Sequence, residues 1–263
     1  MNWPGVWAVR GPKYHGALQS LAGPDRPEFL HGSARPGMKP AKTPAAAAKW
    51  LDSTGFALLM PHKTIPMPSL FEAIRGKTGG HPFRPWTKDS DLMWEFKDEL
   101  PRLHLAFYGS IWGGKPGFCS LEMLPCLMKL WGCPPGPDGF RTAYREGALS
   151  FDANRIGELL IRTGPINTYN LRKRVGIAPN TFKRALAELG GKLIVAKCGK
   201  EAIAKIWEAE IVDLSARVFP KVHAEVRTLS FMAARESALE TMREAAPTMQ
   251  KKQLARLLRV GVE

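Results

Sequence analysis

The chain has 263 residues, enough for one large domain or two modest ones that each bury a core. It carries 38 lysines and arginines against 24 aspartates and glutamates, a formal net charge of +14, which favours a polyanionic partner, although a basic protein with a merely solvated surface has the same composition. The four cysteines have neither the spacing of a disulfide framework nor that of a zinc site, so we expect them to be buried apolar residues and expect no metal and no cofactor.

The first half of the chain predicts an irregular segment followed by an α+β domain. Residues 1–44 are dense in proline and glycine, which interrupt regular elements. Ser69 and Glu72 have capping-box spacing, which marks the start of a helix. Residues 45–139 form the predicted domain, in which we expect helices over 45–51, 69–75, 89–100 and 120–131, strands over 56–60 and 104–112, and a turn or loop over 113–117.

After the break CPPGPDG at 133–139, the pattern predicts a winged-helix domain over residues 140–220. Ser150, and then Asn167 or Thr168, are placed to cap two helices, and a third is expected over about 180–189. A strand, a wing and a returning strand should follow, over residues 193–196, 199–201 and 203–212. The expected fold class is α+β and mainly helical, with winged-helix units and a C-terminal helical segment.

Residues 221–263 predict that C-terminal helical segment, interrupted by Pro247. Thr248 is placed to cap a last helix with four cations, Lys251, Lys252, Arg256 and Arg259. This helix suits a phosphate-contacting face, and it equally suits a solvated basic helix packed through its leucines.

The winged-helix prediction carries a prediction about nucleic acid. The third helix is the candidate recognition helix, and Thr181 and Lys183 near its start are best placed to reach base edges in the major groove. Cations of the second and third helices and of the wing would contact phosphates. The full set of candidate DNA-binding residues is Arg172, Lys173, Arg174, Thr181, Lys183, Arg184, Lys197 and Lys200.

Several segments resemble the AlkZ-type (YcaQ-like) winged-helix DNA glycosylases, and more closely their AlkZ-related branch. The segments are GFALLMP at 55–61, PSLFEA at 68–73, WEFKDELP at 94–101, AFYG at 106–109, SLEMLP at 120–125 and those of the winged helix. The likeness covers about residues 45–260. It implies tandem winged-helix-like units around a concave basic face, in a group where some enzymes excise alkylated or crosslinked bases.

One part of the glycosylase pattern is missing. Those enzymes use a Gln-apolar-Asp or Gln-apolar-Gln motif, and none of the three glutamines here, Gln19, Gln250 and Gln253, begins one. The resemblance therefore implies the fold and DNA binding but assigns no catalytic residue. Glu95, Asp98 and Glu99 are weak candidates for a relocated catalytic carboxylate. A solvated amphipathic helix explains the same three residues.

The leading hypothesis is a double-stranded DNA-binding protein that lacks the glycosylase motif. The alternatives are a glycosylase with a relocated carboxylate and a winged-helix adaptor that binds another protein. No secretion signal and no run of about 18 apolar residues is present, so we expect no membrane partner. The expected location is the cytoplasm, with nucleoid association if the source is bacterial.

Overall fold

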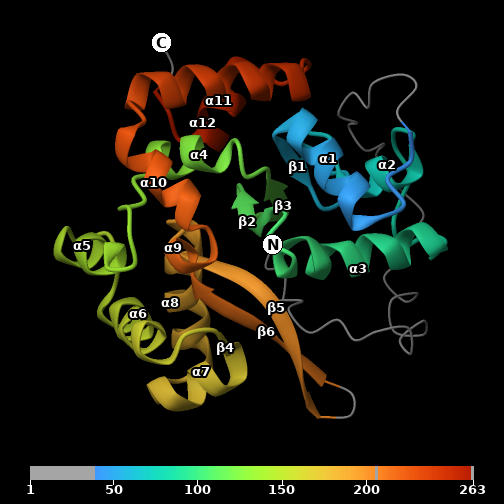
Figure 1. Ribbon diagram of the computed structural model, residues 1–263. Helices are drawn as coiled ribbons and strands as arrows, with labels where there is room; N and C mark the ends of the chain where they lie inside the picture. Colours follow the sequence, from blue (N-terminus) through green and yellow to red (C-terminus); the bar gives the residue numbers. More distant parts are fainter. Residues whose placement is uncertain (1–38, 205–206, 262–263) are drawn as a thin grey trace.

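The computed structural model describes residues 39–204 and 207–261, so the predicted irregular segment over 1–44 lies almost wholly outside the described residues. Within the described ranges the chain forms twelve helices and two three-stranded antiparallel sheets (Figure 1). The predicted α+β, mainly helical class is confirmed.

The first sheet has the strand order β1-β3-β2 and is accompanied by three helices. These elements are α1 (Pro44–Thr54), β1 (Phe56–Leu58), α2 (Leu70–Arg75), α3 (Lys88–Arg102), β2 (Phe107–Trp112) and β3 (Lys115–Cys119). The capping box at the start of α2 is confirmed, since the Ser69 side chain accepts a hydrogen bond from the Glu72 amide and the Glu72 carboxylate accepts one from the Ser69 amide.

The turn or loop predicted over 113–117 is present but shorter than expected, because Lys115 already begins β3. Only Gly113 and Gly114 form the turn, both with positive φ, as a two-residue hairpin turn requires. Gly117 is a strand residue whose lack of a side chain matters: a Cβ there would lie 2.4 Å from the carbonyl oxygen of Ala57. The glycines that resembled a loop in the sequence serve a tight hairpin and close strand packing.

Alternate side chains of this sheet enter two different hydrophobic clusters, as the two-residue period of a strand requires. Phe56, Phe107 and Cys119 point into the larger cluster, with the C-terminal helices. Tyr108 and Phe118 point into the smaller one, with α1, α2 and α3. The sheet therefore joins the N-terminal helices to the rest of the molecule.

Two short helices follow, α4 (Leu124–Leu130) and α5 (Gly139–Arg145). The helix predicted over 120–131 is shorter than expected. Cys119, Cys126 and Cys133 are buried, which confirms their expected role as core residues. Burial raises the pKa of the Cys133 thiol to about 12.

The second half of the chain contains the predicted order of three helices and two strands. Its elements are α6 (Phe151–Thr163), β4 (Ile166–Asn167), α7 (Thr168–Val175), α8 (Pro179–Gly191), β5 (Val195–Ala204) and β6 (Trp207–Leu214), and its sheet order is β4-β6-β5. Ser150 and Asn167 cap α6 and α7 through their side chains.

The hairpin β5–β6 is longer than predicted, and the wing expected at 199–201 is wrong. Gly199, Lys200 and Glu201 are strand residues that pair with β6, and the last pair before the turn joins Ala204 to Trp207. A register shift between Lys197 and Gly199 marks an irregularity in β5. Glycine is common at such bulges, so Gly199 is compatible with a strand although glycine also marks turns in a sequence. The hairpin extends away from the body of the molecule (Figure 1).

The C-terminal helical segment consists of α9 (Ser215–Val218), α10 (Pro220–Thr228), α11 (Phe231–Ala245) and α12 (Lys251–Leu258). Pro247 separates the last two helices as predicted, but the cap assigned to Thr248 is wrong. The N-cap of α12 is Gln250, and its side chain makes no capping hydrogen bond. The larger hydrophobic cluster runs from Phe56 to Leu258 and crosses the break at 133–139.

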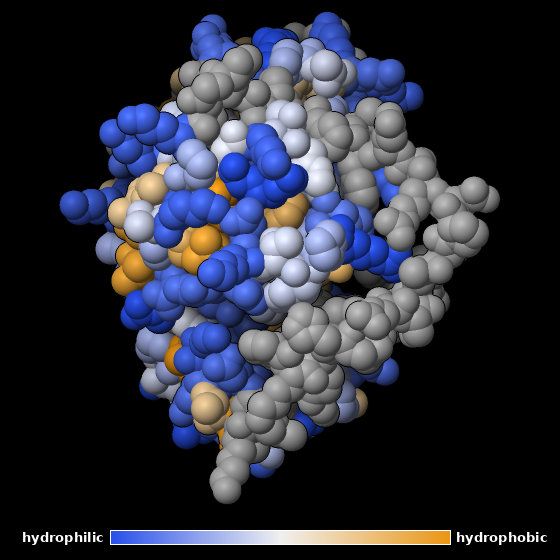
Figure 2. All heavy atoms as spheres, turned by 90° about the vertical axis from the view of Figure 1, so that its right-hand side faces the viewer, coloured by the Kyte–Doolittle hydropathy of each residue, from blue (hydrophilic) through white to orange (hydrophobic). Residues whose placement is uncertain are grey.

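None of the described helices is long and apolar enough to cross a membrane. Figure 2 views the molecule from the side of α2 and α3. Hydrophilic side chains cover most of the described surface there, with small hydrophobic areas between them.

Candidate nucleic-acid interface

The N-terminus of α8 combines free backbone donors with exposed cations. Pro179 opens the helix, no side chain caps it, and its first turn holds no acidic residue. The first amide N–H groups of a helix lack internal partners and carry partial positive charge, which favours an anion. Phe182, Ala185 and Leu189 are buried, so the opposite face of α8 exposes Lys183 and Arg184 and leaves Thr181 half-buried.

Helix α7 places three more cations at its C-terminal end. Leu171 and Val175 bury its inner face. Lys173 and Arg174 are exposed and Arg172 is half-buried. The Lys173 ammonium lies 4.2 Å from the centroid of the Tyr169 ring, a cation–π contact that orders this side chain.

The cations of α7 and α8 are not neutralised by neighbouring acids. Across residues 39–204 and 207–261, no ion pair involves Arg172, Arg174, Lys183 or Arg184. An exposed cation without a carboxylate partner can bind an external anion without first breaking an internal pair. We call the cations of these two helices the α7–α8 face: the half-buried Arg172 and the exposed Lys173, Arg174, Lys183 and Arg184.

Lys200 on the hairpin differs from these cations because it already has acidic partners. It is exposed, and its Nζ lies 2.9 Å from Glu208 Oε2 and 3.7 Å from Asp98 Oδ2. Partial burial alone would lower the pKa of Lys200, but the hydrogen bond to Glu208 and the charge of Asp98 outweigh it and raise that pKa.

Lys197 was expected on the DNA-binding surface, and the structure places it in the interior instead. Its side chain is only 5% exposed, and its Nζ donates to Asp98 Oδ1 at 2.5 Å and to Glu210 Oε1 at 2.9 Å. The wing predicted over 199–201 belongs to β5, which runs on without a turn after Lys197. From this strand the Lys197 side chain points towards Asp98 on α3. The exposed cationic set therefore omits Lys197.

Lys197 belongs to a buried ionic cluster that we call the α3–hairpin junction: Lys97, Asp98, Tyr108, Lys197 and Glu210. The Lys97 ammonium lies 2.5 Å from Asp98 Oδ1, and the Lys197 ammonium lies 5.3 Å from the centroid of the Tyr108 ring. The cluster connects α3 and β2 to the hairpin across about a hundred residues of sequence.

Burial and charge set the protonation states in this junction. Burial alone would raise the pKa of Asp98, but the ammonium groups of Lys197 and Lys97 outweigh it and hold that pKa below its usual value. Burial and then the charge of Lys197 lower the pKa of Lys97. Burial alone would lower the pKa of Lys197, but the charges of Glu210 and Asp98 outweigh burial and raise that pKa above its usual value. Asp98 and Lys197 are therefore a charged buried pair.

The three carboxylates that were candidates for catalysis have three different environments on α3. Asp98 is buried in the junction with Oδ1 bonded to two lysines. Glu99 forms two hydrogen bonds with the guanidinium of Arg102, at 2.8 and 2.7 Å, and these lower its pKa. Glu95 is exposed. No two of them share a hydrogen-bond partner among the described residues.

Sequence reasoning did not anticipate Lys97 or Glu210 as members of the junction. No local signal could have found them, because the partners Asp98 and Lys197 are 99 residues apart and Lys97 resembles a surface lysine of an amphipathic helix. The described residues contain no group of three or more His, Cys, Asp or Glu side chains that could hold a metal ion.

A family model described as AlkZ related matches residues 41–259. The match covers most of the chain, so the protein belongs to the AlkZ-related family, as the sequence resemblance indicated. This membership relates it to the AlkZ-type DNA glycosylases and associates it with DNA. No curated protein and no solved structure matched the chain.

Proposed function

We propose that this protein binds double-stranded DNA through a winged-helix domain formed by α6 to β6. In this proposal α8 is the recognition helix, α7 lies beside it, and the hairpin β5–β6 is the wing. The observation that carries the proposal is the α7–α8 face, where exposed cations without acidic partners surround an uncapped helix N-terminus. The relation of the family to DNA glycosylases supports the same conclusion.

Two kinds of contact would follow from this arrangement. Arg172, Arg174 and Arg184 would pair with backbone phosphates, which supplies affinity and sets the register of the helix. Thr181 and Lys183, within the first turns of α8, would approach base edges in the major groove. Lys200 on the wing would have to give up its bond with Glu208 to bind a phosphate. It would therefore add less to the binding affinity than the cations of the α7–α8 face.

The test measures the binding of a labelled duplex by fluorescence anisotropy between about 50 and 200 mM salt. The wild type should bind with a steep salt dependence. Lys183→Glu combined with Arg184→Glu should weaken binding at least about tenfold and reduce the steepness of log Kd against log salt by about 1, because the lost phosphate contact of Arg184 removes about 0.9.

A matched control uses two exposed lysines of the N-terminal helices. Lys49→Glu combined with Lys88→Glu changes the net charge equally but leaves the α7–α8 face intact. Equal losses in the two double variants would mean that overall charge, rather than α8, drives binding. No binding by the wild type at low salt would contradict the proposal and favour an adaptor that binds another protein.

We propose further that DNA binding here operates without the base-excision chemistry of the related glycosylases. The Gln-apolar-Asp/Gln motif is missing from the sequence, and Asp98 is already bonded to two lysines. Incubation of saturating protein with alkylated duplex DNA should release no base. Release of a base, lost in Glu95→Gln, would contradict this and identify Glu95, the exposed carboxylate of α3, as catalytic.

A further inference from the structure

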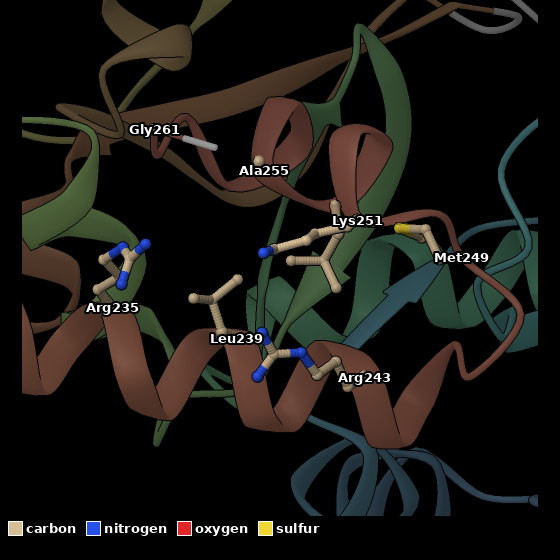
Figure 3. Close-up of a pocket in the computed structure, with 8 residues that line it drawn as sticks. Arg235, Leu239, Arg243, Met249, Lys251, Ala255 and Gly261 are labelled. Carbon is tan, nitrogen blue, oxygen red and sulfur yellow. The ribbon is translucent and has the colours of Figure 1, made fainter. Parts of the chain in front are cut away.

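A hollow of about 450 Å³ lies between α11 and α12, outside the α7–α8 face. Its apolar floor comes from both helices and from the segment that joins them. Three cations lie around this floor, Arg235 and Arg243 from α11 and Lys251 from α12 (Figure 3). The complete lining is Arg235, Leu239, Arg243, Met249, Lys251, Leu254, Ala255 and Gly261.

The charge of the hollow has one sign, since none of its lining residues is acidic. Arg243 and Lys251 are exposed, and across the described residues neither takes part in an ion pair. Helix α11 also carries glutamates, Glu236, Glu240 and Glu244, but none of them lines the hollow. Arg243 and Lys251 are therefore available to an external anion.

Cations that converge on one hollow repel each other unless an anion lies between them. Lys251 is also the first residue of α12, whose N-terminus has no side-chain cap, so the helix adds partial positive charge to the same place. The arrangement matches a ligand with several negative oxygens, and phosphate groups of a nucleic-acid backbone have that chemistry.

We propose that the hollow between α11 and α12 holds backbone phosphates of the same DNA that the α7–α8 face binds. This inference rests on the proposed function. The C-terminal ends of α12 and α8 are in contact, because the Arg259 guanidinium donates to the Gly191 carbonyl oxygen at 2.8 Å. The two helices have 8 and 13 residues, about 12 and 20 Å at 1.5 Å per residue, so their N-termini are separated by no more than these two lengths and the contact between them, a span shorter than a duplex of about 20 base pairs.

The experiment compares salt dependence on a duplex of about 20 base pairs, which spans roughly 70 Å at 3.4 Å per pair and exceeds the combined length of the two helices. Arg243→Glu combined with Lys251→Glu should weaken binding about tenfold or more and reduce the steepness of log Kd against log salt by about 2. Arg243→Lys combined with Lys251→Arg keeps both charges and should retain the wild-type steepness.

The matched control is Arg256→Glu combined with Lys221→Glu, two exposed cations of α12 and α10 that do not line the hollow. It should lose less affinity and steepness than the hollow variant. If the hollow variant equals the wild type, or if the control loses as much, the second contact is overturned while DNA binding by α8 stands. If the wild type does not bind the duplex at all, the proposed function fails and this inference fails with it.

Discussion

The α7–α8 face and the α3–hairpin junction use the same residue type in opposite ways. Lys183 on α8 is exposed and has no ion pair among the described residues, whereas Lys197, only 14 positions later, is buried between Asp98 and Glu210. Both lysines belong to the proposed winged-helix domain, and the sequence around each is comparably basic. Burial and the position of a carboxylate, rather than residue type, separate an exposed surface lysine from a buried structural one.

Charges contribute differently to stability in the buried junction and on the surface. A charge in the interior has lost its hydration, so its partners must compensate, and removing one partner leaves the others uncompensated. A charge on the surface keeps its hydration and contributes little to folding. The junction should therefore control stability and the α7–α8 face should control affinity.

The largest expected effect is on the junction. Lys197→Met keeps most of the side-chain volume but removes the ammonium that Asp98 and Glu210 share. The free energy of unfolding should fall by about 3 kcal/mol, since Glu210 loses its bond to Lys197 and the buried Asp98 carboxylate keeps only Lys97 and the more distant Lys200 to compensate its charge among the described residues. Urea unfolding followed by circular dichroism measures this change.

The matched control for that substitution is Lys183→Met on α8. Because Lys183 is exposed and has no ion pair among the described residues, its replacement should change the free energy of unfolding by no more than about 0.5 kcal/mol, and by the proposed function it should weaken DNA binding. Equal destabilisation by the two variants would contradict the claim that the buried lysine contributes more to stability than the exposed one.

The second effect concerns His223, which is buried like Lys197 but lacks a carboxylate. Its Nδ1 accepts from the Gly136 amide at 3.2 Å, and its Nε2 lies 3.0 Å from the Ser215 hydroxyl, which donates to the Leu193 carbonyl oxygen. This arrangement requires a neutral ring. Burial, and then the charge of Arg227, lower the pKa of His223 to about 4.

Since the pKa of His223 is lower in the folded chain than its usual value of 6.5, the unfolded chain binds the proton first as pH falls. Stability should be complete above pH 6.5 and should decrease by up to about 3 kcal/mol by pH 4. Unfolding of the wild type and of His223→Gln across this range measures it. Parallel pH profiles for the two proteins would exclude His223 as the cause.

The smallest effect concerns a local cap at the start of α6. The Ser150 hydroxyl accepts from the Ala153 amide at the start of α6. Ser150→Ala should lower the free energy of unfolding by about 1 kcal/mol, whereas Ser150→Asp should restore it, since aspartate is also a good cap. Thermal unfolding of the wild type and the two variants measures this change. A loss of unfolding free energy as large as that of Lys197→Met would contradict the expectation that the buried junction contributes more to stability than a local cap.

The elements that depend on near neighbours in the chain were predictable. Ser69, Ser150 and Asn167 cap helices in the structure because a cap bonds an amide only two or three residues away. The turn or loop predicted over 113–117 was too long and the wing over 199–201 was wrong, because a glycine in a strand is accepted only when a partner strand is present. Part of the candidate site was also predictable, since Lys183 and Arg184 lie on the exposed face of an amphipathic helix.

The sequence by itself determined the caps of α2, α6 and α7, the order of the elements in the second half of the chain and the cationic faces of α7 and α8, because short-range hydrogen bonds and the periodicity of apolar residues set them. Only the tertiary structure decided that Lys197 turns inward to Asp98, and that Arg243 and Lys251 face one hollow. Those outcomes depend on which distant carboxylates and apolar surfaces come into contact, and no local pattern encodes a partner that lies a hundred residues away.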